Sequence, residues 1–383
     1  MPAPMTTAAT EPLAKINHAA TMLAVSLAML IAPSAALCQQ SWTIAPFQRP
    51  VTAPVITPNP QSVFFDPLRQ QTVHWEALNT FNPATVVRNG KIYVLYRAED
   101  DTGPKIIGMH TSRLGLASSD DGVHFTRSAT PVFYPADDAQ KDREWPGGVE
   151  DPRVVEAPDG SYVLTYTQWN RKTTSIGVAT SKDLVHWTKY GPAFLPSDRP
   201  AFHSYKSSSI VTQLVDGHLV AAKIHGKFWM YWGEVEIHLA TSPDLIHWTA
   251  IENGKGDPTV LLKRRAGLFD SGFPEVGPPA VLTKNGIVLI YNGKNGASKG
   301  VAGLDPGAYS VGEALFSADY PAKLLKRTNE PVFRPELPFE RSGQYPTGTT
   351  FAEGLVFFKA KWFLYYGCAD SFVGVAVAEK PAS

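Results

Sequence analysis

A segment of about ten residues recurs along this chain at nearly equal spacing. The clear copies are residues 116–125, 178–187 and 239–248, whose starts are 62 and 61 residues apart. Residues 314–319 and 375–379 continue the series in degenerate and truncated form. A fixed period of this size indicates one supersecondary unit repeated along the chain.

Each copy follows a hairpin signal. Asn89-Gly90, Asp159-Gly160 and Asn285-Gly286 are typical of two-residue type I′ turns, which require positive φ. In the last unit, the dipeptide Ala360-Lys361, which is less typical of such turns, occupies this place. Strands are expected before these turns at residues 84–88, 153–156, 280–283 and 355–358, and after them at 91–97, 161–166, 287–291 and 362–366.

Hairpin-linked strands repeated about every sixty residues predict an all-β chain folded as a five-bladed β-propeller. Six or seven blades need more chain than the 383 residues supply. An immunoglobulin-type sandwich does not predict an equal internal period. The proline-rich region from Gln39 to about Leu78 is expected to pack along the outside or to help close the ring.

The first 37 residues differ in character from the rest. Lys15 precedes an apolar run at residues 22–32, and small residues follow it, as in a secretory signal peptide. The run is too short to span a bilayer, so we expect no membrane insertion after cleavage. The prediction is an exported protein, periplasmic or extracellular, whose residues 38–383 form a single catalytic propeller. Cys38 as a lipid-attachment site is a weaker alternative; without it Cys368 stands alone, and the fold does not depend on a disulfide.

Charge and repeated polar residues exclude several functions. Thirty-five basic residues balance thirty-five acidic ones, which argues against a nucleic-acid partner. His124, His186 and His247 recur at one place in the unit and are interpreted as structural. Asp120, Asp183 and Asp244 are interpreted as turn-capping carboxylates. No His, Cys or carboxylate set has metal-ligand spacing, so no metal and no cofactor is predicted.

The candidate functional residues are those that break the repeat where each innermost strand begins. These entrances are aligned as Asn82-Pro83, Asp151-Pro152, Lys206-Ser207, Gly277-Pro278 and Gly348-Thr349. At these entrances each of the five innermost strands is expected to place one residue at the axial cavity. Asp151, beside Glu150 and near Arg153, is the candidate for an acid with a tuned pKa, although Asp-Pro is also a common turn starter.

Further candidates lie near the ends of other strands. Arg97 and Asp100 end the second strand of blade one, and Asp370 takes the corresponding place in blade five. Arg113 precedes the third strand of blade one and is a candidate for binding a sugar hydroxyl or an anion. Glu234 and Glu236 alternate and are expected on one face of a strand, with Glu234 the first candidate for a base that activates water and Glu236 and Glu275 next.

The sequence resembles glycoside hydrolase family 130, the mannoside phosphorylases and β-mannosidases. The matching stretches are Phe81-Asn-Pro-Ala84, Ser112-Arg-Leu-Gly-Leu-Ala117, Gly148-Val-Glu-Asp-Pro-Arg153, Gly277-Pro-Pro279 and Tyr365-Tyr-Gly-Cys-Ala-Asp370. The resemblance implies a five-bladed propeller that acts on a β-mannoside oligosaccharide or glycan with inversion. It implies that Asp151 is the general acid, its proton passing through a sugar hydroxyl. It also implies that Asn82, Arg113, Lys206 and Asp370 hold the sugar or phosphate, and Arg97, Asp100 and Glu275 are added as substrate-binding candidates.

One departure from the family pattern bears on the reaction. Phosphorolytic members typically carry a His-Arg pair on a strand of blade three, where this chain has Trp232-Gly233 followed by Glu234. Loss of two donors and gain of a carboxylate predict an inverting hydrolase with Glu234 as its base. The alternative is a β-mannoside phosphorylase that releases mannose 1-phosphate. A glycan-binding propeller without activity is the third reading, and the intact setting of Asp151 argues against it.

Overall fold

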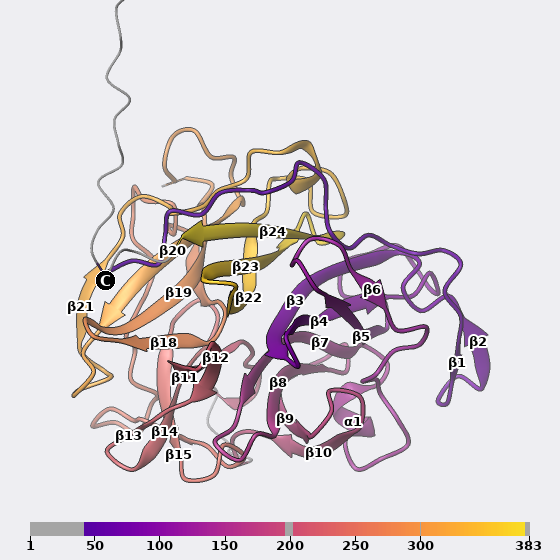
Figure 1. Ribbon diagram of the computed structural model, residues 1–383, viewed down its shortest axis with the longest axis horizontal. Helices are drawn as coiled ribbons and strands as arrows, with labels where there is room; N and C mark the ends of the chain where they lie inside the picture. The colour runs from indigo at the N-terminus through magenta and orange to yellow at the C-terminus, as the bar shows by residue number, and fades with distance from the viewer. Residues whose placement is uncertain (1–41, 196–201, 299, 380–383) are drawn as a thin grey trace, which may run out of the picture. The chain divides into compact units, whose positions relative to one another are not determined.

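Antiparallel strands form nearly all of the regular structure (Figure 1). The computed structural model describes residues 42–195, 202–298 and 300–379, so the predicted signal peptide and Cys38 lie outside the described residues. The helical elements that lie wholly within the described residues are α1 (Lys141–Glu144) and η2 (Pro338–Glu340). Within the described ranges, no helix has the length and apolar character needed to cross a membrane.

The first two repeats form antiparallel sheets whose strands pair in chain order. Blade one consists of β3 (Asn79–Arg88), β4 (Lys91–Glu99), β5 (Ser112–Ser119) and β6 (Thr126–Arg127). Blade two consists of β7 (Gly148–Glu156), β8 (Tyr162–Trp169), β9 (Thr174–Ser181) and β10 (Trp187–Pro192). The predicted turn between β3 and β4 is present, with φ of 49° at Asn89 and 71° at Gly90.

Blades three and four keep this order with local changes. Blade three consists of β11 (Ser208–Val215), β14 (Lys227–Trp232), β15 (His238–Ser242) and β16 (Thr249–Ala250), with β12 (His218–Ala221) and β13 (Lys223–Ile224) inserted after β11. In blade four, β17 (Phe273–Val276) and β18 (Ala280–Thr283) both pair with β19 (Gly286–Lys294), which is followed by β20 (Tyr309–Phe316) and β21 (Leu324–Arg327). The innermost strand of blade four is therefore split in two.

Blade five is completed by the beginning of the described chain. It contains β22 (Phe351–Phe358), β23 (Lys361–Cys368) and β24 (Phe372–Glu379). Gln48 and Ile56 bridge to Val377 and Val373 on the free edge of β24, and Figure 1 shows this indigo segment running along that strand. The segment thus helps to close the ring, and the hairpin β1 (Phe64–Asp66) and β2 (Gln71–Val73) follows it before blade one.

Two buried carboxylates hold the closing segment. Glu313 accepts hydrogen bonds from the backbone N–H groups of Ile44 and Ala45 at 2.9 and 3.0 Å. Glu340 lies 2.7 Å from Arg49 Nε, and the Glu340 side chain is fully buried. Glu313 belongs to blade four, and Glu340 lies in η2 just before blade five. These contacts therefore join the N-terminal segment to the C-terminal part of the chain.

The innermost strands adjoin one another around the axis. β3 contacts both β22 and β7, and β11 pairs in parallel with β18. Apolar side chains fill the space between neighbouring blades; Ala84 and Leu95 of blade one, for example, pack with Val154 of blade two. Five sheets built from consecutive segments and closed by the N-terminal segment confirm the predicted five-bladed propeller.

The repeated Ser-x-Asp segments form loop caps, with one correction to the predicted residues. Asp183 Oδ1 and Asp244 Oδ1 each accept two backbone N–H groups, as expected for turn caps. In blade one the capping residue is Asp121, not Asp120, because Asp121 lies two residues after Ser119. In all three loops the carboxylate also contacts the histidine three residues later, at 2.7–2.8 Å.

Candidate active site

Two bulges bring Asn82 and Asp151 together. The pairing register of β3 shifts at Asn82, and that of β7 shifts at Asp151. Both residues have a left-handed backbone with φ of 46°. A bulge re-aims a side chain out of the regular alternation, and here Asn82 Nδ2 donates to Asp151 Oδ1 at 2.7 Å. Two residues separated by 69 positions thus meet at the entrance of adjacent blades.

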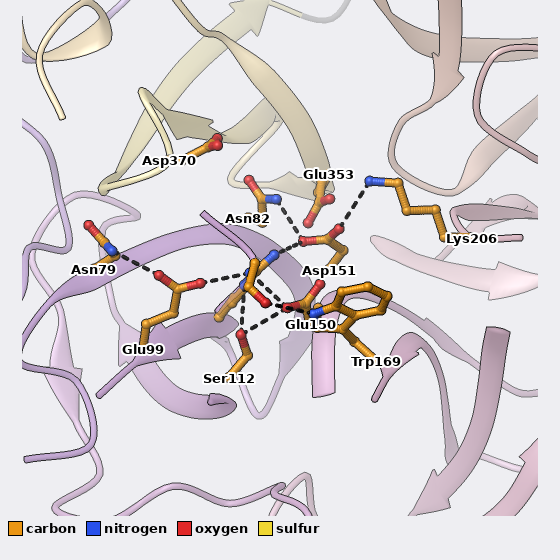
Figure 2. A network of polar contacts seen from close by, with 12 residues as sticks. Asn79, Asn82, Glu99, Ser112, Glu150, Asp151, Trp169, Lys206, Glu353 and Asp370 are labelled. Atoms are coloured by element: carbon orange, nitrogen blue, oxygen red, sulfur yellow. Dashed lines mark hydrogen bonds and ion pairs between the residues drawn. The ribbon is translucent and has the colours of Figure 1, made fainter. Parts of the chain in front are cut away.

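Arg97, at the end of β4, joins three carboxylates. Its Nη1 lies 3.1 Å from Asp151, and its Nη2 lies 2.8 Å from Glu150 and 2.7 Å from Glu99. Its Nε donates to Ser112 Oγ at 3.1 Å. Figure 2 shows the partners Glu99, Ser112, Glu150 and Asp151 gathered in one network. The guanidinium group therefore fixes the orientation of Asp151 and holds negative charge near it.

Lys206 joins a second set of carboxylates from the other side of Asp151. Its Nζ lies 3.8 Å from Asp151 Oδ2, 3.7 Å from Glu234 Oε1 and 3.5 Å from Glu275 Oε1. Ser207 donates to Glu275 at 2.5 Å. The nearest carboxylate oxygens of Asp151 and Glu234 are therefore no further apart than the sum of their two distances to Nζ, 7.5 Å.

Glu353 is a site residue that the sequence analysis missed. Its side chain is fully buried, and its Oε1 lies 2.8 Å from Arg153 Nη1, whose guanidinium also donates to the backbone oxygen of Asp151. Figure 2 places the Glu353 carboxylate next to Asp151. The entrance of blade five is therefore at Glu353 and not at Gly348-Thr349.

A signal for Glu353 was present in the spacing to the following hairpin turn. Asn82 lies seven residues before Asn89, and Glu353 lies six residues before Lys359, the positive-φ residue of the corresponding turn. The register of β22 shifts at this point, as in β3 and β7. Counting back from the turns, instead of aligning Gly-Thr with Asn-Pro, comes within one residue of Glu353.

Glu99 and Asp370 lie beside the same network. Glu99 accepts from Asn79 Nδ2 at 2.8 Å and from Gln344 Nε2 at 3.2 Å. Asp370 follows β23 with φ of 51°. Its carboxylate forms no ion pair with a described residue, and burial raises its pKa to about 6 against the opposing effect of Arg97. Asp370 thus lies beside the network, and substrate binding by it stays a prediction.

Carboxylates outnumber cations in this network. Within the described ranges, the acidic side chains are Glu99, Glu150, Asp151, Glu234, Glu275, Glu353 and Asp370, and the cations that pair with them are Arg97, Arg153 and Lys206. Seven negative charges cannot be balanced by three positive ones in a buried site, so part of the cluster must be protonated.

Burial and the neighbouring charges decide where the protons lie. Burial, the largest influence, raises the pKa of Glu150 to about 7 in spite of Arg97, and Asp151 adds to the effect. Burial likewise raises the pKa of Glu275 to about 7 in spite of Lys206. For Asp151, burial is outweighed by Arg97, Lys206 and Arg153, which hold its pKa below the usual range. Below about pH 7 the ligand-free pair therefore holds one proton, on Glu150, while Asp151 is ionised.

Arg113 and Asp100 form a buried pair of their own. Arg113 Nη1 lies 2.7 Å from Asp100 Oδ2, and Nη2 contacts Asp66. The Arg113 side chain is almost fully buried. The structure thus joins Arg113 to carboxylates and not to Asp151, and substrate binding by this pair stays a prediction.

Glu234 and Glu236 do not lie on a strand as expected. β14 ends at Trp232 and β15 begins at His238, so both glutamates belong to the connection between them. Their regular alternation is lost because Val235 has φ of 72°. Both line a pocket of about 600 Å³, but only Glu234 reaches Lys206. No group of three His, Cys, Asp or Glu side chains among the described residues is arranged to hold a metal ion.

Comparison with known proteins agrees with the fold. The family model described as β-1,4-mannooligosaccharide phosphorylase, of glycoside hydrolase family 130, matches residues 53–381. This chain belongs to that family, whose members act on mannosides.

Three relatives illustrate the range of activities. A 1,2-β-oligomannan phosphorylase from Thermoanaerobacter is 30% identical over 80% of this chain and 91% of its own. A solved glycosyl hydrolase from Bacteroides ovatus is 51% identical, with a TM-score of 0.86, covering 90% of this chain and 97% of that one. A second structure is also 51% identical, with a TM-score of 0.87 and coverage of 90% and 97%. It is described in terms of family hydrolases that target β-1,2 mannosidic linkages in Candida mannan.

Proposed function

We propose that this chain is an exported enzyme that hydrolyses β-mannosidic bonds with inversion, with Asp151 as general acid and Glu234 as general base. The observation that carries the proposal is the pair of glutamates, Glu234 and Glu275, that share Lys206 with Asp151. An inverting hydrolase needs a second carboxylate to deprotonate the attacking water.

The positions of the acid and the base suit this chemistry. Inverting enzymes hold their two carboxyl groups roughly 6.5–9.5 Å apart to leave room for water, and the upper limit of 7.5 Å between the oxygens of Asp151 and Glu234 is compatible with that range. About one third of the Glu234 side chain is exposed, whereas Glu275 is buried. Glu234 is therefore the carboxylate that bulk water reaches.

Asp151 must gain a proton before it acts as an acid. Burial already favours the neutral form, and the three cations, together with the hydrogen bond from Asn82, keep its pKa low. A bound sugar that excludes water increases the effect of burial. The protonated carboxyl of Glu150, which shares Arg97 with Asp151, supplies a proton within the same network.

Electrostatics disfavour phosphate as the nucleophile. Phosphate is an anion and requires positive or neutral donors around it. At the blade-three position this chain has Trp232, Gly233 and Glu234, and Lys206 is already shared by three carboxylates. An anion placed there meets a site with excess negative charge, whereas water does not.

Phosphorolysis is the second candidate, and the names of the curated relatives favour it. The Thermoanaerobacter relative is named a phosphorylase, and so is the family model. The solved structures at 51% identity are described as hydrolases. For the linkage we propose β-1,2, because the Thermoanaerobacter relative and one of these structures are both described by it.

One experiment separates the two reactions. The purified enzyme is incubated with β-1,2-, β-1,3- and β-1,4-mannobiose in phosphate-free buffer and in phosphate buffer, and the products are separated by anion-exchange chromatography. We expect free mannose in both buffers from the β-1,2-linked substrate. Mannose 1-phosphate in phosphate buffer, with no reaction in its absence, refutes hydrolysis and establishes the phosphorylase.

Export is tested separately from the reaction. The predicted signal peptide, residues 1–37, supports a periplasmic or extracellular location. N-terminal sequencing of the protein from the fractionated native host is expected to begin close to residue 38. Recovery of the full-length chain from the cytoplasm contradicts this part of the proposal.

A further inference from the structure

The side-chain amide of Asn82 is held between Asp151 and a glycine of blade five. Its Nδ2 donates to Asp151 Oδ1 at 2.7 Å, as Figure 2 shows. The other arm of the amide, Oδ1, packs against Gly367 of β23. That oxygen is buried and has no hydrogen-bond partner among the described residues. Because only the NH₂ arm can donate to a carboxylate, Asp151 fixes which arm faces it, and the oxygen must fit against Gly367.

Gly367 leaves the space that the amide oxygen needs. A Cβ atom added at Gly367 would overlap Asn82 Oδ1 and would lie 3.1 Å from the backbone nitrogen of Asn82. Gly367 itself is in regular strand structure, paired with Phe351 on one side and with Val373 on the other. The backbone conformation therefore does not require a glycine here, whereas the contact with Asn82 does.

The corresponding position in two other blades carries a side chain. Blades one, two and five each have a bulge in the innermost strand, and the second strand pairs regularly up to that point. The residue that directly follows the partner of the last regular pair is Ala98 in blade one, Gln168 in blade two and Gly367 in blade five. The blade fold thus accepts a side chain at this position, and the need for glycine is specific to the contact with Asn82.

We propose that Gly367 is a positioning residue for the proposed acid, Asp151, and that it acts through Asn82. Its missing side chain lets the amide lie where Nδ2 reaches Asp151 Oδ1. If the amide is displaced, that oxygen keeps only Arg97, whose Nη1 lies 3.1 Å away. This inference rests on the proposed function, because it takes Asp151 to be the general acid.

Gly367→Ala is the first test, with β-1,2-mannobiose as substrate in phosphate-free buffer. We expect kcat to fall by about tenfold or more, because a hydrogen bond to a charged group is lost. The fall of kcat/KM at high pH should begin at a higher pH than in the wild type. The reason is that the Asn82 donor favours the ionised form of Asp151, so its loss raises the pKa of that carboxyl. The charged and titratable groups that face Asp151 are unchanged in this variant: Arg97, Glu150, Arg153, Lys206, Glu353 and Asp370.

A double-mutant cycle with Asn82→Gly separates this role from a purely structural one. Glycine at position 82 removes the amide and suits the left-handed φ of 46°. In that background we expect Gly367→Ala to change kcat by less than about twofold, because the group that it displaces is already absent. Gly254→Ala is the matched control, because a Cβ atom at Gly254 meets nothing within 4 Å, and it should leave activity and pH profile unchanged.

The outcomes are distinguishable even if Gly367→Ala does not fold. Thermal unfolding is followed by circular dichroism for both single variants and the double variant. Recovery of folding in the double variant supports the proposal, whereas a folding defect that persists there overturns it. Equal fold-losses of kcat in the two backgrounds, or an unshifted pH profile in Gly367→Ala, also overturn it. Failure of the wild type to release mannose without phosphate instead overturns the proposed hydrolysis, and the same cycle is then measured in phosphate buffer.

Discussion

Lys206 Nζ lies between the carboxylates of Asp151 and Glu234, at 3.8 and 3.7 Å. Burial opposes its charge, but Glu275, Glu234 and Asp151 outweigh burial and raise the pKa of Lys206 well above its usual value. The ammonium group therefore stays charged and helps to lower the pKa of Asp151. It also contacts both the proposed acid and the proposed base, so one cation joins the two.

Asp151→Asn tests the acid. The amide keeps the size of the side chain but cannot donate a proton as an acid does, so we expect kcat to fall by about 10²–10⁴-fold. Sugar binding, measured by calorimetry, should persist. Near-wild-type turnover in this variant contradicts the assignment of Asp151.

Glu234→Gln tests the base. Loss of the carboxylate removes the acceptor for the proton of water, and we expect release of free mannose to fall by about 10²-fold or more. Glu236→Gln is the matched control, because Glu236 lines the same pocket without reaching Lys206. If Glu234→Gln releases mannose as fast as Glu236→Gln, Glu234 is not the base, and Glu275 is the next residue to test.

The pH dependence should report the Glu150–Asp151 pair. The pKa of Glu150 is raised to about 7 and that of Asp151 is lowered, so the pair holds one proton below about pH 7 and none well above it. We expect kcat/KM to fall above about pH 7, because the Glu150–Asp151 pair then has no proton to give. In Glu150→Gln, Arg97 acts on fewer carboxylates and lowers the pKa of Asp151 further. The fall in kcat/KM should therefore begin at a lower pH than in the wild type. A fall that begins at the same pH in both enzymes argues against the shared proton.

Arg49→Met tests the closure of the ring. Arg49 pairs with Glu340, which is fully buried and also accepts from Tyr366 at 2.8 Å. Removal of one partner of a buried ion pair leaves an uncompensated charge, and we expect the free energy of unfolding to fall by about 3 kcal/mol. Arg334→Met is the control, because the pair of Arg334 with Glu336 is more than half exposed on both sides and is worth less than about 1 kcal/mol. Equal denaturation midpoints for the two variants contradict a closing role for Arg49.

Much of the fold was predictable because its signals are local. The Asn89-Gly90 turn and the repeated ten-residue segments act over a few residues and specify hairpins wherever they occur. Their equal spacing predicts identical units in series. Asp151 was predictable for the same reason, because its setting, Gly148-Val-Glu-Asp-Pro-Arg153, is contiguous in the chain.

The arrangement around Asp151 was decided by closure of the ring. Asn82, Asp151 and Glu353 meet because three bulged strands from separate blades converge, and no local pattern specifies that contact. The same holds for protonation: Glu150 and Asp151 are adjacent carboxylates in the sequence, yet their pKa values are shifted in opposite directions. Burial and the positions of Arg97 and Lys206 set those shifts, and both depend on residues brought together only when the ring is closed.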